Sequence, residues 1–311
     1  MEYLQLIAAQ AGIRLDAGET ALIAKELEAV KAATYDVKCP EFKARQFIPV
    51  NSSPPAGAET VSYDQWDSFG QAKVIGNYAD DLPSVDVLKK RFTNKIASLG
   101  NSYSWSIQDL RASAMAGGMS LDAKRAMAAR RAMEAAIDDL AAAGDANLGM
   151  SGFAAHASVP LVTPTTGTWS GATALQIIAD LNKLVQSIIT TTKQVHLPNT
   201  LLLDTDSFAL INQKPMSADS SNTVLRYFLE NNPYIQSIDQ WHRLDLANAA
   251  GNGPRCVAYD RSPEVLGLEI PQEFEQLPPQ ARNLKFVVPC HARCGGVIMH
   301  YPKAVAYMDG I

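Results

Sequence analysis

Apolar residues recur with helical spacing in the middle of the chain and form short runs on either side of it. The longest helical pattern covers residues 121–143, where one apolar stripe consists of Ala126, Ala129, Met133, Ala136, Ile137 and Leu140. Positions three and four apart share one face of an α-helix. The opposite face of the helix is predicted to carry Arg130, Arg131, Glu134 and Asp138. At 1.5 Å per residue the helix would be roughly 35 Å long, so we expect a rod against which β-structure packs.

The ends of this helix carry recognisable signals. Ser120 can accept a hydrogen bond from the first turn, and Asp122 places a negative charge there. Gly144 marks the exit, and a Gly-Met-Ser-Gly turn follows at residues 149–152. Ten of the 23 residues in between are alanine, the residue with the highest helix propensity.

Short β-type runs and further helices flank the central helix. Upstream runs lie at residues 60–63, 72–75, 85–88 and 92–99, and a short helix is predicted at 106–115. Downstream, residues 172–191 form an amphipathic helix whose buried face is Ala174, Ile177, Leu181, Leu184, Val185 and Ile188. The remaining predicted elements are strands at 200–203, 235–241, 256–259, 284–288, 296–300 and 304–307, and helices at 207–212 and 223–231. The class is therefore α+β.

Two segments lack a hydrophobic core of their own. Residues 1–50 hold helical patterns near 2–10 and 18–33 and then an extended piece, which is typical of an arm lying on another surface. Residues 56–100 form a hairpin-like excursion whose large apolar residues are scattered: Trp66, Phe69, Val74, Ile75 and Phe92. A two-stranded ribbon without a packed face is marginal in water, so we expect this segment to gain stability from a neighbouring molecule.

Composition narrows the function classes. The 311 residues are 47% hydrophobic and only 19% charged, below the usual value of about 25%, so other protein surfaces are expected to cover part of the exterior. The net charge of −5, without a basic stripe, argues against electrostatically driven nucleic-acid binding. The apolar runs are too short for a membrane span or a signal peptide. Four cysteines in a chain of this length favour a reducing compartment.

Two groups of residues offer alternative chemistry. Cys290, His291, Cys294 and His300 could bind zinc, although the spacing differs from that of a zinc knuckle and the segment is predicted to be a strand. Ser151 lies in a turn that partly matches a nucleophile elbow, and His156, His196 or His242 could serve it as a base. The elbow requires Gly-x-Ser-x-Gly between a strand and a helix, which this turn lacks. We therefore predict no catalytic, cofactor-binding or metal-binding residues, and a hydrolase or metal enzyme remains an alternative.

The order of these parts resembles the major capsid protein of tailed phages, which has the Hong Kong 97-type fold that encapsulins share. Residues 103–110 (YSWSIQDL) resemble the family's entry into its short helix, and 120–124 (SLDAK) resemble the start of its spine helix. Residues 143–153 are similar to the turn that follows the spine. Residues 295–299 and 302–307 resemble the strands that return to the family's peripheral domain.

The resemblance implies a division into domains. An N-terminal arm would cover residues 1–55 and an extended loop 56–100. A peripheral domain would hold 101–198 and 280–311, including the spine helix, and an axial domain would hold 199–279. The residues expected to serve assembly are those of the extended loop: Trp66, Phe69, Val74, Ile75 and Phe92. The core of the spine helix is expected to hold Ala126, Met133, Ile137 and Leu140, and an axial loop to hold Asn248, Gly251 and Gly253.

The resemblance also implies a function. The chain would be a structural subunit, not an enzyme, that assembles into the hexamers and pentamers of an icosahedral phage capsid enclosing double-stranded DNA. Expected partners are copies of itself, DNA bound without sequence specificity, a portal, and decoration or cement proteins, with no membrane and no cofactor. It would be assembled in the host cytoplasm and located in the virion. An encapsulin-like compartment is the alternative within the same fold.

Overall fold

The computed structural model describes residues 40–74, 82–109, 111, 121–165, 167–217, 221–247 and 253–311. The description below concerns the unit Phe42–Ile311. The helices predicted near 2–10 and 18–33 lie outside the described residues, as do Cys39, Ile75, Asn248 and Gly251. Of the helix predicted at 106–115, residues 106–109 and 111 are described: Ser106 ends a strand, and 107–109 and 111 are helical.

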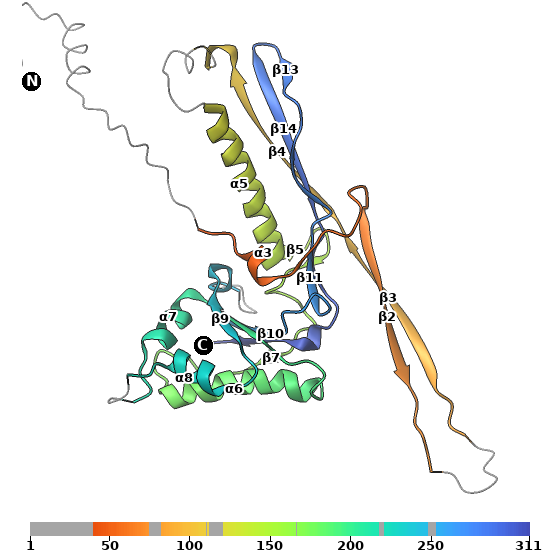
Figure 1. Ribbon diagram of the computed structural model, residues 1–311, viewed down its shortest axis with the longest axis vertical. Coiled ribbons are helices and arrows are strands. Elements are labelled where there is room, and N and C mark those ends of the chain that lie inside the picture. The colour runs from red at the N-terminus through yellow and green to blue at the C-terminus, as the bar shows by residue number, and fades with distance from the viewer. Residues whose placement is uncertain are drawn as a thin grey trace, which may run out of the picture. The chain divides into compact units, whose positions relative to one another are not determined.

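A ribbon of two strands and a longer sheet lie in succession along the chain (Figure 1). Strands β2 (Thr60–Phe69) and β3 (Asp86–Lys95) pair antiparallel over ten residues each. After Ile96, the chain continues as β4 (Ala97–Ser106), which pairs with β14 (Lys285–Cys294) along its whole length. Strands β12 (Gln272–Gln276) and β13 (Gln280–Arg282) pair with the other edge of β14. The predicted hairpin is therefore present, and its second strand leads directly into a sheet of the body.

Helix α5 (Leu121–Ala142) packs against β4 and β14. The predicted stripe faces inward: Ala129, Met133 and Ile137 are buried, and Ala126, Ala136 and Leu140 are partly buried. Gly144 ends the helix with a positive φ of 76°, and a Cβ there would clash with the Met150 carbonyl oxygen. Strands β5 (Gly144–Asp145) and β6 (Met150–Ser151) pair at this turn, so a glycine is required at the predicted exit.

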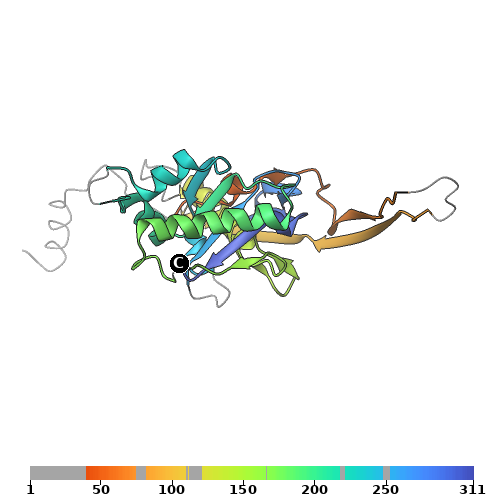
Figure 2. The same ribbon diagram turned by 90° about the horizontal axis from the view of Figure 1, so that it is seen from below.

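A second layer is built on a five-stranded sheet with the order β7-β16-β10-β8-β9. Its strands are β7 (Leu161–Val162), β8 (Thr200–Leu203), β9 (Ser237–Gln240), β10 (Arg255–Tyr259) and β16 (Val305–Asp309). Helices α6 (Ala174–Thr191), α7 (Thr205–Gln213) and α8 (Val224–Asn231) pack with this sheet around a shared core (Figure 2). The six residues predicted for the inner face of α6 are all buried. Thr173 and Gln176 form a complete capping box at its start.

A small sheet and three short helical elements complete the body. Strand β11 (Leu266–Glu269) lies between β1 (Val50–Asn51) and β15 (Gly296–Met299). Helix α3 (Ala44–Phe47) and the 3-10 turn η1 (His242–Leu244) place Phe47 and Trp241 in contact, with ring centroids 5.8 Å apart. A second 3-10 turn, η2 (Pro302–Ala304), precedes β16. Phe153 and Tyr259 extend the same core, which reaches Met133 and Ile137 of α5.

Several predicted elements were wrong. The run at 92–99 is two strands separated at Ile96, and residues 72–74 of the run at 72–75 are not a strand. Strands β11, β12 and β13 were not predicted at all. Helix α6 packs with β8, β10 and β16 in one core, while the predicted division assigns α6 and β16 to the peripheral domain (101–198 and 280–311) and β8 and β10 to the axial domain (199–279). The division into peripheral and axial domains stays a prediction.

Candidate functional site

The ribbon of β2 and β3 carries exposed apolar side chains. Among the described strands, these two pair only with each other. Trp66 is 64% exposed and Phe69 52% exposed, and Val74 is fully exposed. Further exposed side chains on or beside the ribbon are Leu82, Val85, Val87 and Leu88. Apolar area of this kind is stabilised when another surface covers it.

The root of the ribbon, by contrast, is attached to the body through aromatic side chains. Tyr63 stacks on its register partner Phe92 with ring centroids 5.3 Å apart, and its ring meets the His300 ring edge-on at 4.5 Å. The Tyr63 hydroxyl also donates to the Met299 carbonyl oxygen at 3.5 Å. Phe92 is therefore half-buried at the root, whereas Trp66, Phe69 and Val74 are available to a partner.

Charged side chains stiffen the middle of the ribbon. Asp64 accepts a hydrogen bond from Arg91 Nε at 2.7 Å and pairs with Lys89 Nζ at 2.6 Å. These contacts, that with Arg91 foremost, hold the pKa of Asp64 well below its ordinary range. Lys89 Nζ also lies 5.1 Å from the centroid of the Trp66 ring, which favours one orientation of the indole.

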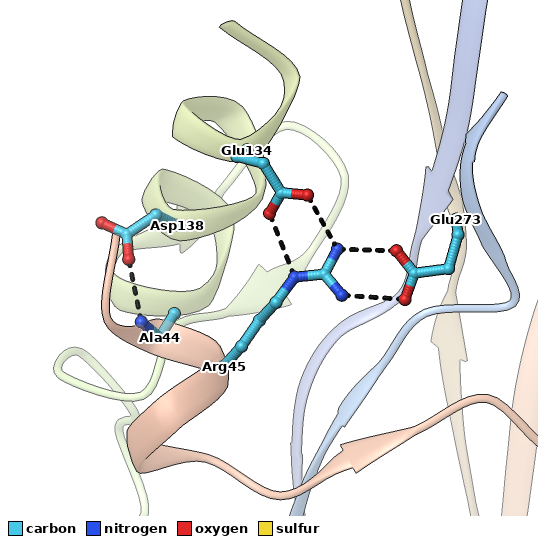
Figure 3. A network of polar contacts seen from close by, with 5 residues as sticks. All are labelled: Ala44, Arg45, Glu134, Asp138 and Glu273. Carbon is cyan, nitrogen blue, oxygen red and sulfur yellow. Dashed lines mark hydrogen bonds and ion pairs between the residues drawn. The ribbon is translucent and has the colours of Figure 1, made fainter. Parts of the chain in front are cut away.

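A polar network joins the segment before the ribbon to the spine helix (Figure 3). Arg45 of α3 donates to Glu134 of α5 from Nε and Nη2 at 3.0 and 3.3 Å. It also donates to Glu273 of β12 from Nη1 and Nη2 at 2.8 and 2.9 Å. The hydrogen bond with Glu273 contributes most to raising the pKa of Arg45, and Arg45 lowers the pKa of Glu273. The guanidinium thus ties α3, α5 and β12 together.

Asp138 forms a second connection at the next turn of the spine. It is 1% exposed, and its carboxylate accepts from the Ala44 backbone N–H at 3.0 Å and from Arg243 Nε at 2.8 Å. The sequence predicted only that Glu134 and Asp138 lie opposite the apolar stripe; the structure buries Asp138 and leaves Glu134 partly exposed. Their partners Arg45 and Arg243 come from segments 89 and 105 residues away, so helical periodicity could not reveal them.

We expect Asp138→Ala to lower the free energy of unfolding by roughly 2–3 kcal/mol, because the buried Ala44 backbone N–H loses its acceptor and Arg243 Nε loses its charged partner. Asp139→Ala is the matched control, since Asp139 also pairs with Arg243, at 2.5 Å, but its side chain is 60% exposed. Denaturant unfolding of both variants measures the difference. Equal losses would contradict the structural role assigned to Asp138.

Two residues of the alternative catalytic set share a cavity, whereas the residues of the alternative metal set do not converge within the described part of the chain. Ser151, His156 and His300 line a cavity of about 300 Å³ beside the ribbon root. His156 Nδ1 accepts the Ser158 backbone N–H, and burial lowers the pKa of both His156 and His300. Cys290 and Cys294 are buried and free. Among the residues that the structure describes, no three His, Cys, Asp or Glu side chains converge as a metal site would require.

We expect the double substitution Cys290→Ser and Cys294→Ser to leave assembly intact, and the purified protein to hold no stoichiometric metal. A serine hydroxyl at position 294 can still accept the Gly296 N–H that the Cys294 sulfur accepts now. Elemental analysis and electron microscopy of the assembled particles measure both outcomes. About one zinc ion per chain would reopen the metal-site interpretation.

The spine and axial residues complete the predicted set. Met133 and Ile137 are almost fully buried, and Ala126 and Leu140 are partly buried beside them. Gly253 is partly buried just before β10, while the other two axial-loop residues lie outside the described part. Sequence reasoning missed Arg45, Asp138 and Arg243. Within the described residues, no helix is long and apolar enough to cross a membrane.

Solved structures share this architecture. A chain from the capsid of Myoviridae phage XM1 matches with a TM-score of 0.81 and 15% identity, covering 93% of this chain and 98% of that one. A chain from Mycobacterium phage Bobi matches with a TM-score of 0.65 and 14% identity, covering 95% and 98%. A virus-like particle from Pyrococcus furiosus matches with a TM-score of 0.54 and 13% identity, covering 85% and 90%. No match is found among curated proteins.

The α+β fold, with its ribbon, long spine helix and two packed layers, is the Hong Kong 97-like capsid fold, which defines a class of shell-forming structural proteins. The family model for major capsid proteins matches residues 70–311. The chain belongs to this family. It is a structural subunit of a phage capsid located in the virion, it forms a homo-oligomeric shell, and it is not an enzyme.

Proposed function

We propose that copies of this chain assemble into hexamers and pentamers of an icosahedral capsid, with the ribbon of each copy lying across its neighbour. The observation that carries this proposal is the exposed apolar part of the ribbon, Trp66 and Phe69 above all, which has a firm root but no covering layer within the described chain. Surfaces that fit a different surface of the next copy close into rings when the rotation allows. The ribbon is suited to such a heterologous contact.

The two packed layers support a division of each subunit into a peripheral and an axial domain. The layer of α5, β4 and β14 corresponds to the proposed peripheral domain, and the layer of α6 and the five-stranded sheet corresponds to the proposed axial domain. We place α6 and β16 with the axial domain because they share its core, which extends the range of 199–279 expected from the sequence. The segment before β2 acts as the end of the N-terminal arm.

The proposed contents are double-stranded DNA held without sequence specificity. The net charge of −5 suits a container that does not gather nucleic acid by its own basic segments. A portal and decoration or cement proteins are the further proposed partners, and the host cytoplasm is the proposed place of assembly. The match to the Pyrococcus furiosus particle keeps a protein compartment as a second candidate.

Electron microscopy of the purified protein, combined with nuclease-protected nucleic-acid analysis of particles made during infection, tests this function. We expect closed icosahedral shells whose hexamers and pentamers are built from this chain and which protect DNA of genome length. Shells that hold protein instead of DNA would favour the compartment. A discrete small oligomer that never forms shells would contradict both candidates.

The loop containing Asn248, Gly251 and Gly253 is expected to lie near a capsomer axis and to tolerate small sequence changes. Its Asn, Ala and Gly content is typical of a loop tip. Replacing Asn248 and Gly251 with serine should leave the yield of closed shells unchanged. A density map that places this loop far from every local symmetry axis would contradict the axial assignment.

A further inference from the structure

A buried carboxyl group lies where three segments of the chain meet. Glu269, the last residue of β11, is 2% exposed. Its Oε1 accepts a hydrogen bond from Asn51 Nδ2 at 3.0 Å, while its Oε2 has no hydrogen-bond partner within the described part of the chain. A buried oxygen without a partner carries a large penalty when it is charged and a smaller one when it is protonated.

Glu269 lies beside strand β1 and beside the turn that connects β14 to β15. Asn51 belongs to β1, the strand by which the segment after α3 pairs with β11, and its Oδ1 accepts both the N–H and the hydroxyl of Ser53. Gly295, in the turn between β14 and β15, packs against the Glu269 Cβ so closely that a side chain there would meet it at 3.0 Å. The same glycine faces Ile96, the residue that separates β3 from β4 at the ribbon root.

We propose that Glu269 is a proton-controlled latch: its neutral form keeps β1 paired with β11 beside the ribbon root, and its ionised form loosens that pairing. On ionisation the Oε2 proton leaves to solvent, and the negative charge stays on a buried carboxyl group whose Cβ packs against Gly295. The hydrogen bond from Asn51 satisfies only one of the two oxygens. The proposal concerns the folded subunit itself, so it goes beyond the capsid function and does not depend on it.

The neighbouring charges do not compensate an ionised Glu269. Burial raises the pKa of Glu269 above its ordinary value of 4.5, and the Asn51 hydrogen bond opposes this by a smaller amount. Titratable or charged groups on nearby elements include Cys294 and Arg293 on β14, Glu273 on β12 and Arg45 on α3, and Glu269, Glu273 and Arg45 all act electrostatically on Cys294. Arg45 is already engaged by Glu134 and Glu273, and Arg293 Nη1 donates to the Ala56 carbonyl. Neither cation donates to Glu269.

The direction of the pH effect follows from linkage. Because burial raises the pKa in the folded state above that in the unfolded chain, the folded state prefers the protonated carboxyl. This preference stabilises the fold fully below about pH 4.5 and is lost as the pH rises through the folded-state pKa. Opening of β1 should then become more frequent by up to about tenfold per pH unit in that window.

Hydrogen exchange of the full-length chain between pH 5 and 8, corrected for intrinsic exchange rates, tests the latch. In the wild type, protection of peptides covering residues 48–60 should fall several-fold as the pH rises, while peptides from α6 should keep their protection. Glu269→Gln should remove this pH dependence, because the amide cannot ionise. Glu264→Gln, an exposed residue in the loop before β11, is the matched control and should behave as the wild type.

A second variant keeps the proposal testable if Glu269→Gln does not fold. Asn51→Asp replaces the stabilising donor with a second carboxyl group, which should disfavour ionised Glu269 further and move the midpoint of the loss in protection. Equal pH dependence in wild type and Glu269→Gln would overturn the proposal. So would a wild-type protein whose 48–60 protection is constant across this range, or an Asn51→Asp midpoint identical to that of the wild type.

Discussion

Met133→Asp is expected to abolish folding of the subunit, and with it all assembly. The side chain is 2% exposed and lies in the core shared by α5, α3 and η1. A carboxylate placed there without a partner costs roughly 4 kcal/mol or more, against a total stability of about 5–15 kcal/mol for a typical protein. The expected result is insoluble or unfolded protein, measured by circular dichroism and by solubility after expression.

Met127→Asp is the matched control for this substitution. Met127 lies on the same helix, almost two turns earlier, but it is 59% exposed, so an aspartate there keeps its water. It should fold with nearly the stability of the wild type. Soluble, shell-forming Met133→Asp protein would show that the apolar stripe of the spine helix is not a folding core.

Loss of shells without loss of folding is the expected outcome when Trp66, Phe69 and Leu88 are all changed to serine. These side chains are exposed in the subunit, so removing them takes little from its own core. In an assembled particle each would contribute about 1.5–3 kcal/mol if fully covered, repeated at every copy. Electron microscopy should show folded subunits or open fragments in place of closed shells.

The control for the ribbon variant is Leu175→Ser, which removes a side chain that is 69% exposed on α6. It should leave shell formation unaffected if the ribbon acts specifically. Replacing residues 72–88 with a short Gly-Ser turn should have the same effect as the triple substitution. Hydrogen exchange adds an independent measurement, because ribbon amides should exchange quickly in the free subunit and slowly in the particle. Equal protection in both states would show that the ribbon does not lie on a neighbour.

Local patterns predicted the longer helices of this fold well, but the short helix α3 lies around Phe47, in a segment that was wrongly predicted to be extended. Helix α6 carries a complete apolar stripe and a Thr-x-x-Gln capping box, so its buried face and its start could be predicted from neighbouring residues alone. The buried stripe of α5 could also be predicted from neighbouring residues, and so could its end, where Gly144 adopts the positive φ that favours glycine. Strand β8 is a short continuous apolar run, and it was predicted with the correct bounds.

The features that were missed depend on partners far away in the sequence. Residues 285–294 alternate weakly, and they form one long strand because β4 pairs with them from about 190 residues upstream. Strands β12 and β13 contain mostly exposed polar residues, so only their pairing with β14 makes them strands. Asp138 was predicted only to lie opposite the apolar stripe, and its burial could not be predicted because only the fold brings Arg243 and the Ala44 N–H to it.

The continuity between β3 and β4 determines how a tensile load on the ribbon reaches the body. A pull along β3 passes through Ile96 into β4 in the same strand direction, and β4 is held to β14 by ten register pairs, from Ala97–Cys294 to Ser106–Lys285. Force applied along an antiparallel ladder shears its hydrogen bonds, which lie across the strands, and loads them together instead of peeling them one at a time. A pulling force on the ribbon is therefore distributed over the whole β4–β14 ladder, and the same holds for strain between neighbouring subunits.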